Sequence, residues 1–203
     1  MYLINWSIHA NLDAPSGARP FRHLSGGMIR ASEYKIASGT NSNIFTGDIV
    51  KLLDTGYIDV ADATDTPVLG VFAGVKYTAS DGEVVYKKYF PTGTTTLGSA
   101  DVTAYVYDDP NITFRIQSAG SADFADIGNL ADHVAGTGST TTGQSGHEIS
   151  GTTGTGTATF RILRLIDDPD NSAGTNGEFE VVIYEHQLNE HVSGGSASTA
   201  PGV

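Results

Sequence analysis

Short apolar runs, each bounded by Gly, Asp, Asn, Thr or Ser, follow one another along the chain from Met28 onward. Short runs at such close spacing are typical of β-strands in a sandwich or a barrel. We predict strands at Ile49–Leu53, Tyr57–Val60, Val68–Tyr77, Val84–Phe90, Val102–Tyr107, Ile112–Gln117, Ala158–Ile166 and Glu178–His186. The predicted fold class is therefore all-β, a β-barrel or sandwich of short antiparallel strands.

Two strand pairs can be assigned from the turns that connect them. Ser80–Glu83 contains an Asp-Gly pair, which predicts a hairpin turn leading into the strand at Val84. The connection Asp167–Gly177 is rich in Asp, Pro, Asn and Gly, the residues that tight turns require. We expect the strands on either side of this connection to form an antiparallel pair.

One segment, Ser121–Val134, has apolar residues at helical spacing and a serine at the N-cap position. Its apolar positions are Phe124, Ile127, Leu130 and Val134. Gly128 inside the segment weakens a helix, because glycine loses more backbone freedom on folding than other residues. We therefore expect at most one short helix, or a turn, at this place.

The remaining segments define the organisation of the chain. Residues 1–27 contain several prolines and glycines and have no sustained periodicity, which predicts an extended N-terminal arm. Residues 28–192 hold the β-rich domain. Within it, residues 135–157 are almost entirely Gly, Thr and Ser and predict a long exposed loop, which either contacts a neighbour or is a surface insertion. Residues 193–203 predict a flexible C-terminal tail.

Charge changes the interpretation of the arm. The formal net charge is -12, yet Met1–Lys35 carries four cations against two anions, so this segment is +2 and the remainder is -14. A cationic segment on an acidic body indicates an arm that docks elsewhere, and the alternative is a terminal strand with solvated charges. The acidic balance argues against nucleic acid as a partner. No apolar run approaches the roughly 20 residues of a membrane span, so we expect no membrane partner.

None of the motifs that carry chemistry is complete. The chain has no cysteine, which excludes disulfides, cysteine-based metal sites and thiol catalysis. Gly138–Ser145 has the spacing of a phosphate-binding loop, but Gln144 stands where a lysine is required. His186–His191 is spaced one residue too long for an inverted zincin, and Asp167–Asn171 fits a turn better than a calcium loop. We expect no enzymatic activity, no cofactor and no metal.

Between Met28 and Gln187, five sequence segments that combine a predicted strand with a turn are distinctive. They are Phe45–Val50, Thr55–Ile58, Leu69–Tyr77, Tyr105–Asn111, and Arg161–Leu165 together with Asp168–Asn171. Together they resemble structural proteins of tailed-bacteriophage virions, in particular head-decoration (cement) proteins. The order of a Gly-Asp-x-Val turn and a Leu-Gly-Val strand is also similar to a smaller family of β-barrel capsid decoration proteins. This chain is longer and adds the Gly/Thr-rich loop and the C-terminal strand pair.

The resemblance implies a non-enzymatic role on the outer surface of the capsid head, where such proteins bridge major capsid subunits and stabilise the shell. The partners would be the major capsid protein and further copies of this chain, as a homo-trimer or a dimer. We place the capsid contact in and beside the arm, because Trp and Arg are favoured at binding hot spots. The apolar anchors would be Trp6 and Phe21, and the residues that pair with acidic capsid groups would be Arg19, Arg22 and Arg30. The alternative for Trp6 is packing on its own domain.

A second function remains open, that of a tail, baseplate or head-fibre protein with a receptor- or glycan-binding face. Tyrosine rings can stack on sugars, and six tyrosines lie in or beside the predicted strands: Tyr57, Tyr77, Tyr86, Tyr89, Tyr105 and Tyr107. Aromatic residues are enriched in β-sheets for packing reasons alone, so these positions do not decide between the two functions.

Overall fold

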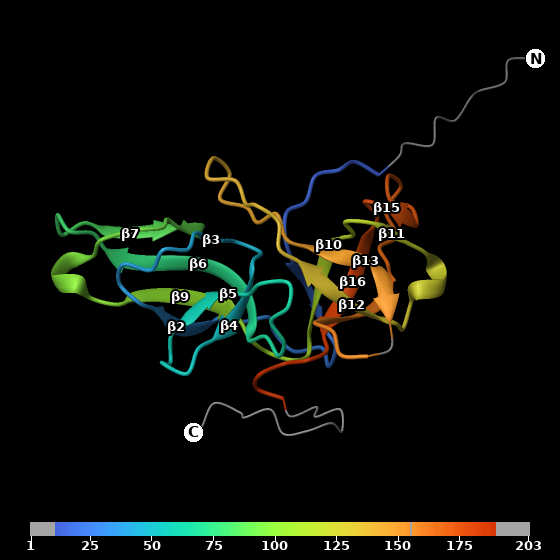
Figure 1. The fold of residues 1–203 in the computed structure, drawn as a ribbon, viewed down its shortest axis with the longest axis horizontal. Helices are drawn as coiled ribbons and strands as arrows, with labels where there is room; N and C mark the ends of the chain where they lie inside the picture. The colour runs from blue at the N-terminus through green and yellow to red at the C-terminus, as the bar shows by residue number, and fades with distance from the viewer. Residues whose placement is uncertain (1–10, 155, 190–203) are drawn as a thin grey trace, which may run out of the picture.

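The computed structural model describes residues 11–154 and 156–189, and these form two β-rich lobes that lie side by side (Figure 1). Each lobe is built on one large antiparallel sheet. One cluster of buried apolar side chains lies within lobe B, and the other lies mainly in lobe A but also includes Ile49 and Val71 from strands of lobe B. The all-β prediction is confirmed. In the described part of the chain no sheet closes into a barrel, and the arrangement is consistent with a β-sandwich.

Lobe A contains a six-stranded sheet whose spatial order is β1-β10-β16-β14-β12-β13. Its strands are β1 (Arg19–His23), β10 (Ile112–Gln117), β16 (Glu178–Ile183), β14 (Phe160–Leu165), β12 (Leu130–Val134) and β13 (Glu148–Gly154). A short pair, β11 (Ser121–Ala122) with β15 (Gly174–Thr175), accompanies it. Alternate residues such as Phe114, Phe160 and Phe179 are fully buried in one core, which leaves the other face of β10, β14 and β16 polar.

Lobe B contains β2 (Ser32–Ile36), β9 (Val102–Tyr107), β6 (Gly70–Thr78), β4 (Ile49–Leu52) and β5 (Ile58–Val60) in that spatial order, with β7 (Val84–Lys87) paired to β6. Lys35 of β2 forms an isolated bridge with Tyr57, the residue before β5. A small pair, β3 (Ile44–Phe45) with β8 (Tyr89–Phe90), completes the lobe. Gly70 permits the close crossing of β6 and β9, because a Cβ there would lie 2.2 Å from the Tyr107 carbonyl oxygen.

Most predicted strands are present. The bounds of β9 and β10 are those predicted, and β4, β5, β6, β14 and β16 differ from the prediction by one to three residues at their ends. The predicted hairpin forms, with Thr78 opposite Val84. The strands that flank Asp167–Gly177 also pair antiparallel, as β14 and β16.

The segment Ser121–Val134, where we expect at most one short helix or a turn, forms a turn between two short strands. The segment contains β11, a single 3-10 turn at Phe124–Asp126 and β12. Asp123 and Asp126 form a capping box that closes one turn, and Gly128 then adopts a left-handed conformation (φ 92°) that ends it. From Leu130 onward, pairing with β13 and β14 determines the conformation instead of helical spacing.

The described part of the arm lies on the body of the protein. Residues 19–23 form β1 at one edge of the lobe A sheet, and Trp6 lies outside the described residues. The Gly/Thr-rich segment also differs from a continuous loop, because Glu148–Gly154 form β13 with Ile149 fully buried. Its first part reaches lobe B, where the Thr46 N–H donates to the Gly143 carbonyl (3.1 Å). The predicted tail, 193–203, lies outside the described residues.

Within the described ranges, no helix combines the length and the apolar character that crossing a bilayer requires.

Candidate docking face

Five of the six arginines lie on the outer face of the lobe A sheet. The strand registers place them in two rows that cross β1, β10, β16 and β14. Residues opposite one another in an antiparallel sheet share a face, so these rows form one surface. The first row is Arg19, Arg115, Glu180 and Arg164, and the second is Arg22, Thr113, Val182 and Arg161. We call this surface the arginine face.

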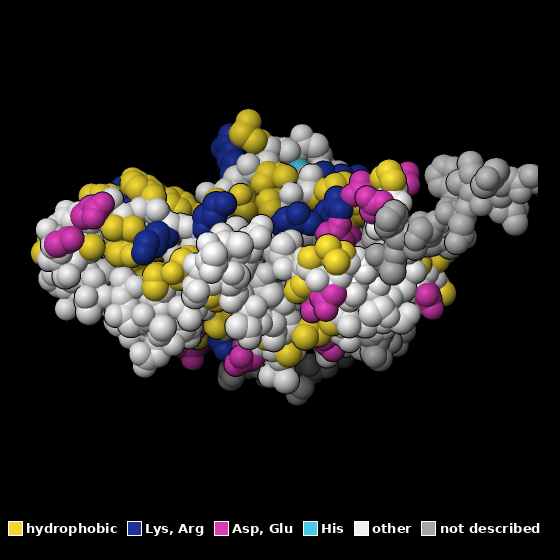
Figure 2. All heavy atoms as spheres, turned by 90° about the horizontal axis from the view of Figure 1, so that it is seen from above, with side chains coloured by type: hydrophobic (Ala, Val, Ile, Leu, Met, Phe, Trp, Pro, Cys, Tyr) yellow, Lys and Arg dark blue, Asp and Glu magenta, His cyan; other side chains and the backbone are white. Residues whose placement is uncertain are grey.

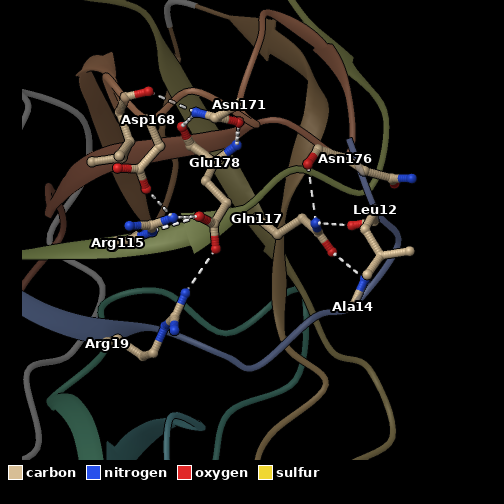
Figure 3. A network of polar contacts seen from close by, with 10 residues as sticks. Leu12, Ala14, Arg19, Arg115, Gln117, Asp168, Asn171, Asn176 and Glu178 are labelled. Carbon is tan, nitrogen blue, oxygen red and sulfur yellow. Dashed lines mark hydrogen bonds and ion pairs between the residues drawn. The ribbon is translucent and has the colours of Figure 1, made fainter. Parts of the chain in front are cut away.

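Three carboxylates hold four of these arginines in place. Glu178 accepts a bond from Arg19 Nη2 (2.7 Å) and pairs with Arg115, which also reaches Asp168 (2.7 Å), as Figure 3 shows. Glu180 accepts bonds from Arg22 and Arg164. Five guanidinium groups therefore face three carboxylates, which leaves an excess of two positive charges on a chain of net charge -12.

Two groups of the arginine face have pKa values that favour their charged forms. Burial alone would raise the pKa of Glu180, but hydrogen bonds from Arg22, Thr113 and Arg164 outweigh it and lower the pKa. Burial would lower the pKa of Arg115, and its bonds to Glu178 and Asp168 outweigh that effect and raise it. Both shifts favour the charged form of the group concerned, so Glu180 and Arg115 are ionised at neutral pH.

Apolar side chains border the arginines. Phe21 occupies a bulge in β1 between Pro20 and Arg22, is 42% exposed, and has its ring centroid 5.8 Å from the Arg164 guanidinium. Leu24 and Met28 follow it and are exposed. Figure 2 shows Lys and Arg side chains interspersed with hydrophobic ones along one side of the molecule. Arginine beside exposed apolar groups is the composition typical of protein-binding surfaces.

The structure brings together three of the five predicted contact residues. Arg19, Phe21 and Arg22 lie on the arginine face, but both arginines already have partners within the chain. Arg30 lies in the exposed connection between β1 and β2, outside the two rows, and Trp6 is not among the described residues.

Sequence reasoning missed three members of the face, Arg115, Arg161 and Arg164. Alternation in the predicted strands was a usable signal for the first two, since the neighbours of each are core residues. Arg164 had no such signal, because a bulge after Ile162 shifts it onto this face.

The arm crosses one end of the arginine face and is fastened there by Gln117 (Figure 3). The side-chain amide of Gln117 donates to the carbonyls of Leu12 (2.7 Å) and Asn176 (3.0 Å) and accepts from the Ala14 N–H (3.1 Å). Asn11 adds bonds to the carbonyls of Ser172 and Thr175. These contacts border a shallow cavity of about 340 Å³ that Arg115 and Glu178 also line.

A second group of titratable side chains is buried between the lobes. Asp48 Oδ2 accepts the Phe45 N–H (2.7 Å), and Asp48 Oδ1 lies 3.6 Å from His147 Nε2. Burial raises the pKa of Asp48 to about 6 and lowers that of His147 to about 4. The His147 ring stacks on His133 with centroids 5.7 Å apart.

This buried group does not have the geometry of a nucleophilic site. The Ser145 hydroxyl oxygen accepts the His147 backbone N–H (2.9 Å), and among the described residues no hydrogen bond joins this hydroxyl to the imidazole. The His147 Nδ1 is occupied by the Ile49 N–H (3.3 Å). Across residues 11–154 and 156–189, no group of three or more His, Asp and Glu could hold a metal ion.

The other motifs have structural roles. Gly138 packs against the Phe45 ring, and the Gln144 backbone bridges to Thr46, so the segment with phosphate-loop spacing lies against lobe B. The interpretation of Asp167–Asn171 as a turn is confirmed, because the Asn171 amide bonds the backbone of Ile166 and Glu178. His186 is buried, and the end of His186–His191 lies outside the described residues.

The tyrosines do not form one platform. Tyr77 is buried in the lobe B core, Tyr89 stacks on Phe45, and the Tyr57 hydroxyl bonds Asp101. Tyr86 is 66% exposed on β7, with Lys76 Nζ 5.4 Å from its ring centroid.

No protein-family model matches the chain, and no curated protein or solved structure matches it either.

Proposed function

We propose that the protein is a structural capsid-decoration (cement) protein that docks its arginine face on an acidic surface of the major capsid subunits of a tailed-phage head. The observation that supports this proposal is the concentration of five arginines in two rows on one sheet face of an acidic chain. Guanidinium groups bind carboxylates through parallel hydrogen bonds, which gives such a face both affinity and orientation.

The rest of the molecule suits this role. Six paired strands make the docking face rigid, so little conformational freedom is lost on binding. The acidic remainder of the chain repels packaged DNA, which favours a position on the outside of the shell. Bridging neighbouring capsid subunits requires contacts and no reaction, so the proposal includes no enzymatic activity and no cofactor.

A second candidate is a tail, baseplate or head-fibre protein that binds glycans through lobe B. Tyr86 is the observation that favours it, because an exposed ring beside Lys76 can stack on a sugar. In this case substitution of Tyr86 would abolish binding to the host surface.

The test is co-sedimentation of the purified full chain with heads that lack it. We expect Arg22→Ala/Arg161→Ala to weaken binding by at least about tenfold, the loss of a charge-assisted contact. Lys87→Ala/Lys88→Ala, which also removes two cations, is the matched control on lobe B and should bind like the wild type. Unchanged binding by a folded arginine variant would refute docking through this face.

A further inference from the structure

Glu180 is a fully buried carboxylate on the outer face of β16, between arginines from two other strands. Its Oε1 accepts from Arg22 Nε on β1 (2.6 Å), and its Oε2 accepts from Arg164 Nε on β14 (2.5 Å). The arginine side chains themselves are 47% and 52% exposed. One buried carboxylate therefore orients two half-exposed guanidinium groups.

This pairing leaves the outer ends of both guanidiniums available. A guanidinium has five N–H donors, and here the Nε donor of each is bonded to Glu180. Among the described residues, none accepts a hydrogen bond from the Nη groups of Arg22 or Arg164. Phe21 lies beside the Arg164 guanidinium and limits its movement.

We infer that Arg22, Glu180 and Arg164 form an anion clamp, in which Glu180 holds the two guanidiniums so that their Nη groups together bind one carboxylate of an acidic protein surface. The inference rests on the proposed function, since the capsid surface would supply that carboxylate. Two guanidiniums and one carboxylate have a net charge of +1, which a carboxylate neutralises. A phosphate group carries nearly two negative charges at neutral pH and would leave an excess of negative charge on an already acidic chain.

In the clamp, Glu180 is a positioning residue. This role makes a prediction opposite to that of simple charge attraction. If attraction alone governed binding, Glu180→Gln would tighten the binding of an acidic ligand, because the substitution removes a negative charge. If Glu180 orients the guanidiniums, the same substitution weakens binding, because the amide can accept only one charge-assisted bond and its nitrogen repels the second arginine.

The test uses the full chain and a glutamate-rich hexapeptide, with affinity measured by calorimetry at low salt. We expect Glu180→Gln to weaken binding about tenfold, the loss of one charge-assisted hydrogen bond. Equal or tighter binding by folded Glu180→Gln would overturn the clamp. Inorganic phosphate and sulfate are measured in parallel, and tighter binding of either ion than of the peptide would overturn the assignment to a carboxylate.

A second variant keeps the inference testable if Glu180→Gln does not fold. Arg22→Lys/Arg164→Lys retains both charges but removes the planar fork, and we expect a similar weakening. Lys87→Arg/Lys88→Arg is the matched control, because it also retains two charges at two exposed positions but lies on lobe B, and it should bind like the wild type. Full affinity of the double lysine variant would overturn the clamp.

Head binding, measured with the same proteins, separates the two proposals. If the double lysine variant binds the peptide weakly and no form of the protein binds heads, the clamp stands and the proposed function fails. If instead Arg22→Lys/Arg164→Lys binds heads as tightly as the wild type does, the clamp fails, and docking through the rest of the arginine face stands.

Discussion

The two lobes carry positive charge in different ways. Lobe A has five arginines on one face, four of them bonded to carboxylates that the sheet itself supplies. Lobe B has all five lysines, and these are spread over β2, β4, β6 and the β7 region, with one close ion pair, Lys51 to Asp65 (2.6 Å), among its described residues. Arginine forks can be fixed by a planar partner, whereas lysine is a flexible point charge. Similar charge thus yields an oriented surface in one lobe and a diffuse one in the other.

The largest expected effect tests whether the two lobes unfold independently of one another. Phe114 is fully buried in lobe A, in the same cluster as Ile49 and Val71 from the strands of lobe B. Phe114→Ala should lower the free energy of unfolding by about 3–5 kcal/mol. Because both lobes contribute to this cluster, we expect one shared transition in a urea titration followed by circular dichroism.

The matched control for Phe114→Ala is Val84→Ala, an exposed position at the β6–β7 hairpin, which should leave the midpoint unchanged. Two separate transitions, of which only one responds to Phe114→Ala, would show that the lobes are thermodynamically independent.

The second test concerns the buried polar group between the lobes. Burial lowers the pKa of His147 from 6.5 to about 4, so its contribution to stability is complete above pH 6.5 and is lost as the pH falls toward 4. Burial raises the pKa of Asp48 from 3.8 to about 6, so its contribution is complete below pH 3.8 and is lost as the pH rises through 6. Each effect amounts to about 3 kcal/mol, and the two oppose each other between pH 4 and 6.

Asp48→Asn removes one side of this balance. We expect the free energy of unfolding of the variant to fall more steeply than that of the wild type as the pH decreases from 6.5 to 4, by a few kcal/mol over that range. Asp62→Asn controls for the loss of one acidic group, because Asp62 is exposed and lines a shallow pocket together with Asp48 and His147. Parallel stability curves for Asp48→Asn and the wild type would contradict the opposing titration.

The smallest expected effect concerns the arm, residues 11–17, compared with the Gly/Thr-rich segment that contacts lobe B. Gln117→Ala removes three hydrogen bonds to the arm and its surroundings and should cost about 1–2 kcal/mol. Amide hydrogen exchange of residues 11–17 should accelerate in this variant. Gln144→Ala, in the exposed segment on lobe B, is the matched control, and equal exchange in both variants would show that Gln117 does not fasten the arm.

Alternation and turn chemistry were sufficient to predict the strands of the two sheet centres. β9 and β10 have unbroken patterns, and their bounds follow from sequence. β1 and β13 were not predicted, because Pro20 interrupts the first and glycines interrupt the second, and in both cases pairing with a neighbouring strand determines the conformation. Leu130 illustrates the same point, since helical spacing there is overruled by two strand partners.

The arginine face was only partly predictable for a related reason. Its arginines come from three strands that begin at residues 19, 112 and 160, and they meet through the register that places Arg115 between Arg19 and Glu180. A register between distant strands depends on the packing of both, and no local pattern encodes it. The bulge that turns Arg164 outward is likewise visible only in the folded sheet.

The neighbouring positions of β1 and β10 have a consequence for how the chain assembles. Every strand of lobe B is made between them, from residue 32 to residue 107. During synthesis β1 therefore leaves the ribosome early. It stays unpaired until β10 has been made, after all the strands of lobe B. Closing so long a loop is slow, and the unpaired strand carries exposed backbone groups in the meantime. We expect lobe B to form first and the arginine-bearing sheet to close last.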